Sequence, residues 1–127
     1  MTPTILVLLV EDDSLIAAAL ADDLEEEEFT VRRAANGREA IALLDGEETF
    51  SAIVTDIRLG EGPDGWEVAR HARERNHSIP VVYITGDSAH DHAVYGVPDS
   101  IMLQKPFVAA QLITAVTTLM NAVPPPE

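Results

Sequence analysis

The 127-residue sequence has no cysteine, few basic residues and no long hydrophobic run. Without cysteine, the chain can form neither a disulfide framework nor a thiolate metal site. Eight lysines and arginines face 22 acidic residues, for a net charge of −14. Direct nucleic-acid binding is therefore not expected, because phosphate contacts need cationic side chains. The apolar run at residues 5–10 is too short for a signal peptide or a membrane span, so we expect a cytoplasmic protein with no membrane contact.

What the sequence does contain is an alternation of apolar runs with segments of helical periodicity. The apolar runs are typical of strands at 5–10, 51–56, 81–85 and 100–103, and the segment at 29–34, which mixes apolar and charged residues, is typical of a further strand. The helical segments are at 14–28, from 37 onward, from 64 onward, at 88–95 and at 108–123. This alternation predicts an α/β fold, a doubly wound five-stranded parallel sheet with helices on both faces. The length predicts one domain over residues 1–127, with a Pro-rich tail at 124–127.

Local patterns predict how the first helix and the second strand are placed. Ser14 is the predicted N-cap of the first helix. The predicted inner face of that helix comprises Ile16, Ala19, Leu20, Ala21 and Leu24. The second strand carries Arg32 and Arg33, and charged side chains of this kind favour an edge position in the sheet.

Reactive side chains end or directly follow four of the predicted strands. They are Glu11 and Asp12, Asp56, Thr85, and Lys105. In an open α/β sheet, sites form outside the carboxyl ends of the strands, so these side chains should meet at one edge. Three carboxylates at one place repel one another and require a cation, and hard oxygen ligands of this kind suit Mg²⁺.

Beside a divalent cation, Asp56 can act as a nucleophile toward phosphorus and form an acyl phosphate. Mg²⁺ and the Lys105 ammonium can neutralise charge on the phosphoryl oxygens. The Thr85 hydroxyl can donate a hydrogen bond to one of those oxygens. The residues at this edge therefore predict that a phosphoryl group is taken up on Asp56.

Four short segments, Val10–Asp13, Thr55–Asp56, Ile84–Gly86 and Lys105–Phe107, together resemble the receiver domain of two-component response regulators. The resemblance covers nearly the whole chain and implies a flavodoxin-like fold with strand order 2-1-3-4-5. It also implies that Asp56 is a phosphoacceptor in phosphorelay signal transduction, with a histidine kinase or histidine phosphotransfer protein as donor. We then expect a stand-alone receiver, not an enzyme, that acts by contact with a downstream protein as a monomer or weak homodimer.

The resemblance further implies how a magnesium ion would be held. Asp12 would be a direct ligand and Glu11 a ligand through water, beside Asp56 itself. The main-chain carbonyl of Arg58 would supply a third contact. A cis peptide bond is implied before Pro106.

The sequence departs from the usual receiver pattern in four places, of which the fourth is the pair Arg58 and Asp87. Met102 stands where receivers usually carry an aromatic residue in the fifth strand, so the coupling of Thr85 to that strand is expected to differ. The loop after Asp56 is one residue longer than usual, with its proline displaced to Pro63. The segment from Thr85 to Lys105 is about two residues shorter than usual, which predicts a short fourth helix.

Arg58 and Asp87 occupy the positions two residues beyond Asp56 and Thr85, where the family tunes loss of the phosphoryl group. Their opposite charges predict an ion pair over the site. Two other functions stay open. A haloacid-dehalogenase-type phosphatase would also use an aspartate nucleophile, but it wants a second aspartate where this chain has Arg58. A receiver-like scaffold would bind its partner without phosphate.

Overall fold

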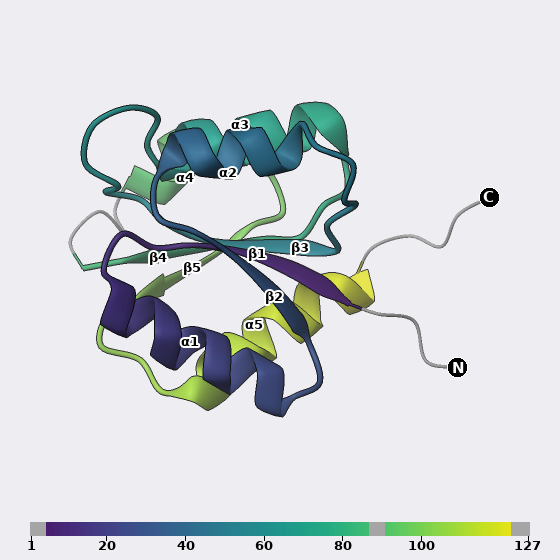
Figure 1. The fold of residues 1–127 in the computed structure, drawn as a ribbon. Helices are drawn as coiled ribbons and strands as arrows, with labels where there is room; N and C mark the ends of the chain where they lie inside the picture. Colours follow the sequence, from purple (N-terminus) through teal and green to yellow (C-terminus); the bar gives the residue numbers. More distant parts are fainter. Residues whose placement is uncertain (1–4, 87–90, 123–127) are drawn as a thin grey trace.

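The computed structural model describes residues 5–86 and 91–122, which form a sheet with helices packed against both faces (Figure 1). The strands are β1 (Leu6–Val10), β2 (Thr30–Ala34), β3 (Ala52–Asp56), β4 (Val81–Thr85) and β5 (Ile101–Gln104). The helices are α1 (Ser14–Glu26), α2 (Gly37–Leu44), α3 (Gly65–Arg75), α4 (His92–Tyr95) and α5 (Ala109–Ala122). The alternation read from the sequence therefore gave the right element order.

All five strands run parallel in the order β2-β1-β3-β4-β5, which confirms the predicted doubly wound, flavodoxin-like sheet. Every residue of β1, β3 and β4 is buried, because strands flank them on both sides and helices cover both faces. β2 is an edge strand, as predicted, with Arg32 and Arg33 exposed. Val10 lies opposite Thr55, and Asp56 lies opposite Ile84, so the central strands end at nearly the same level.

The sheet separates two hydrophobic layers. Figure 1 shows α1 and α5 on one face of the sheet and α2, α3 and α4 on the other. Alternate residues of each strand enter opposite layers, as in β1, where Leu9 packs with α1 and α5 while Leu8 packs with α2 and α3. Tyr83 of β4 is fully buried in the α3 layer, beside Trp66.

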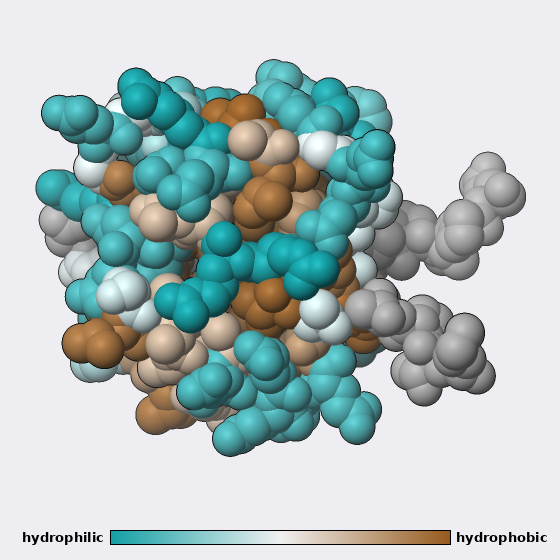
Figure 2. Space-filling view, viewed as in Figure 1, coloured by the Kyte–Doolittle hydropathy of each residue, from teal (hydrophilic) through white to brown (hydrophobic). Residues whose placement is uncertain are grey.

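Hydrophilic residues spread across most of the viewed surface in Figure 2, with smaller hydrophobic areas between them. This agrees with a net charge of −14 and an ordinary apolar content. A few large apolar side chains are nevertheless exposed: Leu15, Ile16, Val94, Tyr95 and Val108. They lie at three places in the sequence, at 15–16, 94–95 and 108, and exposed apolar residues in such small groups are ordinary on protein surfaces.

The start of α1 differs from the prediction. Asp13 is the N-cap in place of Ser14, and its carboxylate accepts from the backbone N–H groups of Leu15 (2.9 Å) and Ile16 (3.1 Å). A carboxylate can accept from two N–H groups at once, whereas a serine hydroxyl at position 14 lies one residue too late to do so. The helix also ends at Glu26, before the predicted Glu28.

The predicted inner face of α1 is partly wrong as well. The buried residues are Ala17, Leu20, Ala21 and Leu24, which follow the i, i+3, i+4, i+7 spacing of one helix face. Ile16 and Ala19 lie one position off that stripe and are exposed.

Other element boundaries shift by one or a few residues. β5 begins at Ile101, one residue late, and ends at Gln104. The described part of the predicted helix at 88–95 forms only the short α4, and residues 88–90 lie outside the described residues. α5 begins one residue late, and its predicted end at Val123 is also outside the described residues.

Candidate phosphoryl-acceptor site

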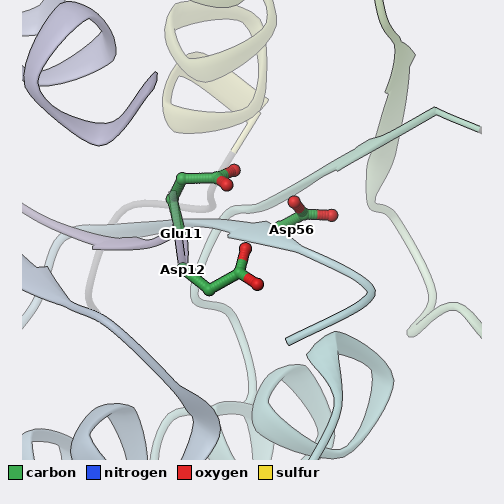
Figure 3. Close-up of side chains that lie close together, drawn as sticks. All are labelled: Glu11, Asp12 and Asp56. Atoms are coloured by element: carbon green, nitrogen blue, oxygen red, sulfur yellow. The ribbon is translucent and has the colours of Figure 1, made fainter. Parts of the chain in front are cut away.

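The carboxyl ends of β1, β3 and β4 bring the predicted site residues to one edge of the sheet. Glu11 and Asp12 directly follow β1, Asp56 ends β3, Thr85 ends β4, and Lys105 follows β5. Figure 3 shows the Glu11, Asp12 and Asp56 side chains gathered at this edge. One carboxylate oxygen from each of these three residues lies within 4.8 Å of the others. Parallel pairing accounts for the meeting, because it aligns the ends of strands that are far apart in sequence.

Lys105 is the cation of this acidic cluster. Its Nζ lies 3.1 Å from Asp56 Oδ2, to which it donates a hydrogen bond, and 3.6 Å from Glu11 Oε2. Burial by itself lowers the pKa of Lys105, but the hydrogen bond and the negative charges of Asp56 and Glu11 raise it above its usual value. The ammonium therefore stays charged at neutral pH beside the two carboxylates.

The main chain at Lys105 is tied to the end of β4. The Lys105 N–H donates to the Thr85 carbonyl at 2.7 Å, which extends the pairing of β4 and β5 by one step. The peptide bond between Lys105 and Pro106 is cis, which confirms the prediction. The lysine and the buried Thr85 thus lie at adjoining strand ends.

Glu11 is the most enclosed of the three acids. It is 3% exposed, and its Oε1 accepts from the Asp13 N–H at 3.1 Å. Its Oε2 is buried and accepts no hydrogen bond from the described part of the chain. Burial is the main cause that raises the pKa of Glu11 from 4.5 to about 7, and the charge of Asp56 adds to the rise.

The donor set fits a divalent cation. Glu11 Oε2 is buried next to two further carboxylates and accepts no hydrogen bond from residues 5–86 and 91–122. The Lys105 ammonium balances only part of this negative charge. Oxygen ligands in this number suit Mg²⁺, which binds through one or two carboxylates and keeps several waters. Asp12 is exposed, so its carboxylate can reach a hydrated ion, whereas Glu11 is enclosed.

Known proteins show which family the chain belongs to. The family model of the response regulator receiver domain matches residues 7–117. The chain belongs to the response regulator receiver family. Receivers of this family accept phosphate in two-component signal transduction and work with histidine kinases.

Solved structures and curated proteins agree with this assignment. A response regulator receiver protein from Sinorhizobium medicae is 43% identical, with a TM-score of 0.93 over 95% of this chain and 98% of that one. The receiver domain of a Pseudomonas aeruginosa sensor histidine kinase, solved with magnesium in its active site cleft, has a TM-score of 0.80 over 94% of this chain and 99% of that one. At 22% identity, that structure supports the fold alone.

The transcriptional regulatory protein TcrA of Mycobacterium tuberculosis is 34% identical over 123 residues, which cover 95% of this chain and 48% of TcrA. The chain spans about half the length of the curated relatives it matches. Within residues 5–86 and 91–122, no helix is long and apolar enough to cross a membrane.

The β3–α3 loop of this receiver carries Arg58. The exposed Arg58 stands between buried Ile57 and buried Leu59. The Ile57 N–H donates to the Ile84 carbonyl at 3.3 Å, and the Ile57 carbonyl accepts from the Gly65 N–H at 2.8 Å. The loop is therefore closed at its base, beside Asp56. The predicted partner of Arg58, Asp87, lies outside the described residues.

Met102, the residue that replaces the usual aromatic, is half-buried in β5. It packs against the same hydrophobic layer as Tyr83, its register partner on β4. Tyr83 is fully buried, its ring centroid is 4.7 Å from that of Trp66, and its hydroxyl accepts from the Val97 N–H at 3.1 Å. An aromatic residue thus lies beside position 102, on the neighbouring strand.

Two residues near the site were missed by sequence reasoning. Asp13 both caps α1 and donates its N–H to Glu11. Gly65 begins α3 so close to Asp56 that an added Cβ would overlap the Asp56 carbonyl oxygen. The Asp-Gly pair at 64–65 signals a turn before a helix, but the close approach to Asp56 depends on how β3 and α3 pack.

Proposed function

We propose that this receiver takes up a phosphoryl group on the Asp56 carboxylate. The observation that carries the proposal is the acidic cluster with its single ammonium: three carboxylates within 4.8 Å and Lys105 Nζ 3.1 Å from Asp56 Oδ2. The Asp56 side chain retains 10% of its exposed surface, so the nucleophile is enclosed on most sides but still open to an incoming group. Enclosure of this kind strengthens each electrostatic interaction at the site.

In the proposed step, a carboxylate oxygen of Asp56 forms a bond to the phosphorus of a phosphohistidine on the donor protein. The phosphorus–nitrogen bond breaks, and its electron pair leaves with the donor imidazole, which takes a proton from solvent. The product is an acyl phosphate on Asp56. Lys105 is placed to neutralise charge on the phosphoryl oxygens, and the Thr85 hydroxyl supplies a further donor.

Mg²⁺ is the proposed cofactor. When bound, it would neutralise charge on the carboxylates and on the phosphoryl oxygens. Asp12 and Asp56 would offer direct oxygen ligands, Glu11 a contact through water, and Arg58 its main-chain carbonyl. The buried Glu11 Oε2, which accepts no hydrogen bond from the described residues, supports this arrangement.

The proposed donor is a histidine kinase or a histidine phosphotransfer protein, and the proposed output is contact with a downstream protein. Phosphorylation would shift a conformational equilibrium through Thr85 and the β5 side of the sheet. Arg58 and Asp87 are proposed to set the lifetime of the acyl phosphate. Curated relatives such as TcrA are transcriptional regulatory proteins of about twice this length.

Phosphoryl uptake is tested by incubating the protein with Mg²⁺ and a small acyl phosphate donor and measuring its intact mass. We expect a mass gain that is lost in mild base. Asp56→Asn should abolish the gain, whereas Asp22→Asn, a matched change on the exposed part of α1, should retain it. A gain that persists in Asp56→Asn, or none in the unmodified protein, would refute the proposal. Continuous release of phosphate from a small phosphomonoester would instead favour the phosphatase alternative.

A further inference from the structure

The outer half of the β3–α3 loop lies directly on the first residue of α2. Gly37 begins α2 and is buried, and its N-cap is Asn36, whose side chain accepts from the Glu39 N–H at 2.9 Å. A Cβ added at Gly37 would overlap the Pro63 carbonyl oxygen and lie 2.9 Å from Pro63 Cβ. The backbone of the loop therefore occupies the space that a side chain at position 37 would need.

A second glycine completes this contact from the side of the loop. Gly62 has a φ of +91°, a conformation that residues with a side chain rarely adopt. A Cβ added there would be 3.6 Å from Arg38 Nε, so Gly62 lies alongside the second residue of α2. Residues 62–63 and residues 37–38 thus form one contact with a glycine on each side.

The inner half of the same loop is anchored independently. Ile57 and Leu59 are each 3% exposed and belong to the hydrophobic layer under α2 and α3. The hydrogen bond from the Gly65 N–H to the Ile57 carbonyl closes the base of the loop at 2.8 Å. The main chain of Arg58 therefore lies between two core residues, and the contact on α2 holds the loop further along, at residues 62–63.

We infer that Gly37 and Gly62 are positioning residues for cation binding, because their contact fixes the outer half of the loop whose inner half offers the Arg58 carbonyl. If a larger residue forces the contact apart, we expect the loop to move and α2 to stay in place. The helix is held by buried Ala40 and Leu44, whereas residues 60–62 of the loop are exposed. The atoms nearest to an added Cβ belong to Pro63 at position 37 and to Arg38 at position 62, and to none of the carboxylates. The inference rests on the proposed function, since it assumes that the Arg58 carbonyl is a ligand.

The test is calorimetric titration of Mg²⁺ into three single variants and one double variant. Gly37→Ala perturbs the contact from the helix and Gly62→Ala perturbs it from the loop. Gly46→Ala is the matched control, since Gly46 follows the other end of α2 and an added Cβ there comes only within 3.3 Å of a carbonyl oxygen. We expect each of the first two changes to raise the Mg²⁺ dissociation constant roughly tenfold, as loss of an outer support commonly does.

The double variant and thermal unfolding separate positioning from a general loss of stability. Because both glycines act on one loop, Gly37→Ala with Gly62→Ala should weaken binding by less than the product of the single effects. A merely structural role would lower the melting temperature without Mg²⁺ and leave the dissociation constant unchanged. An unchanged dissociation constant in either folded variant overturns the inference, and Gly62→Ala, on an exposed loop, decides it if Gly37→Ala fails to fold. Failure of the unmodified protein to bind Mg²⁺ would refute the proposed function instead.

Discussion

The strands that carry the carboxylates and the strand that leads to the lysine are built differently. Every residue of β1 and β3 is buried, whereas β5 has half-buried and exposed residues only. The helix after β1 has 13 residues and a side-chain cap, whereas α4, which precedes β5, has four residues that are half-buried or exposed. The acids of the site thus lie at the ends of fully buried strands, whereas Lys105 follows a partly exposed strand at the edge of the sheet.

This difference suggests where the protein can change shape at low cost. Segments with few buried contacts open at lower free energy than core strands do. Besides the pairing of β5 with β4 and the packing of partly buried Met102, the α4–β5 side has a few polar contacts. Among them are Val97 N–H to the Tyr83 hydroxyl and His92 Nε2 with Ser100 Oγ at 2.7 Å. We therefore expect the acids to keep their places on phosphorylation while the β5 side rearranges.

The largest effect is expected at Lys105, where the two regions meet. Lys105→Met removes the ammonium 3.1 Å from Asp56 and should slow phosphoryl uptake from a small donor by about a hundredfold or more. Lys105→Arg keeps a positive charge and should retain more of the rate. Circular dichroism should show an unchanged fold in both. Uptake by Lys105→Met at the rate of the unmodified protein would mean that the residue after β5 contributes nothing to the chemistry.

The next effect is expected at Glu11, the buried acid that follows β1, and it concerns how stability depends on pH. Burial raises the pKa of Glu11 to about 7 in the folded protein, whereas the ordinary value of 4.5 applies to the unfolded chain. The folded protein therefore holds the carboxyl proton of Glu11 more tightly than the unfolded chain does. The unfolding free energy without metal should therefore fall as pH rises from about 4.5 to 7, and the total loss from this group is at most about 3 kcal/mol. Glu11→Gln should remove that loss and leave the protein more stable than the parent at pH 8.

Urea unfolding at pH 5 and pH 8, with and without Mg²⁺, measures the effect. The matched control is Glu25→Gln, at an exposed position on α1, which should keep the slope of the parent. Mg²⁺ should stabilise the parent more at pH 8 than at pH 5, because it relieves the ionised Glu11. Equal pH slopes in Glu11→Gln and the parent would show that the buried acid is not the source.

The sequence was a good guide where local signals coincide with the sheet and a poor one where packing decides. Asp56, Thr85 and Lys105 could be placed because parallel strands bring their ends together whatever the detail of the loops. The N-cap of α1 was misplaced by one residue, since the Asp13 carboxylate and not the Ser14 hydroxyl caps the helix. Local propensity does not distinguish these two caps, because the choice depends on which backbone N–H groups each side chain can reach.

Contacts between segments far apart in the chain could not be predicted from the sequence, for a different reason. The stacking of Pro63 on Gly37 joins positions 26 residues apart, and nothing in either local pattern indicates it. Likewise, the pairing of Tyr83 with Met102 depends on the register of β4 against β5. Such contacts follow from the three-dimensional packing of elements whose types were correctly predicted.

A smaller effect is expected at the hydrogen bond that holds the α4–β5 side. Tyr83→Phe keeps the ring beside Trp66 but removes the acceptor of the Val97 N–H, and leaving that buried donor unpaired should cost about 1–3 kcal/mol. Tyr95→Phe, at a residue 52% exposed, is the matched control and should change stability little. Faster hydrogen exchange at Val97 with unchanged exchange in β1 would sharpen the contrast. Equal loss of protection in both regions would show that they unfold as one unit.

The smallest effect is expected on the surface of α4 itself. Val94 is 74% exposed, so Val94→Ala removes little buried surface and should change the unfolding free energy by less than about 0.5 kcal/mol. Val54, in the middle of β3, is fully buried in a hydrophobic layer, and Val54→Ala should cost about 2 kcal/mol because the change leaves a cavity there. The two substitutions remove the same atoms, so urea unfolding of the pair measures the packing difference between the regions directly. Similar losses of unfolding free energy at both positions would mean that α4 is packed as tightly as the strands. The α4–β5 side would then be no easier to rearrange than the rest of the fold.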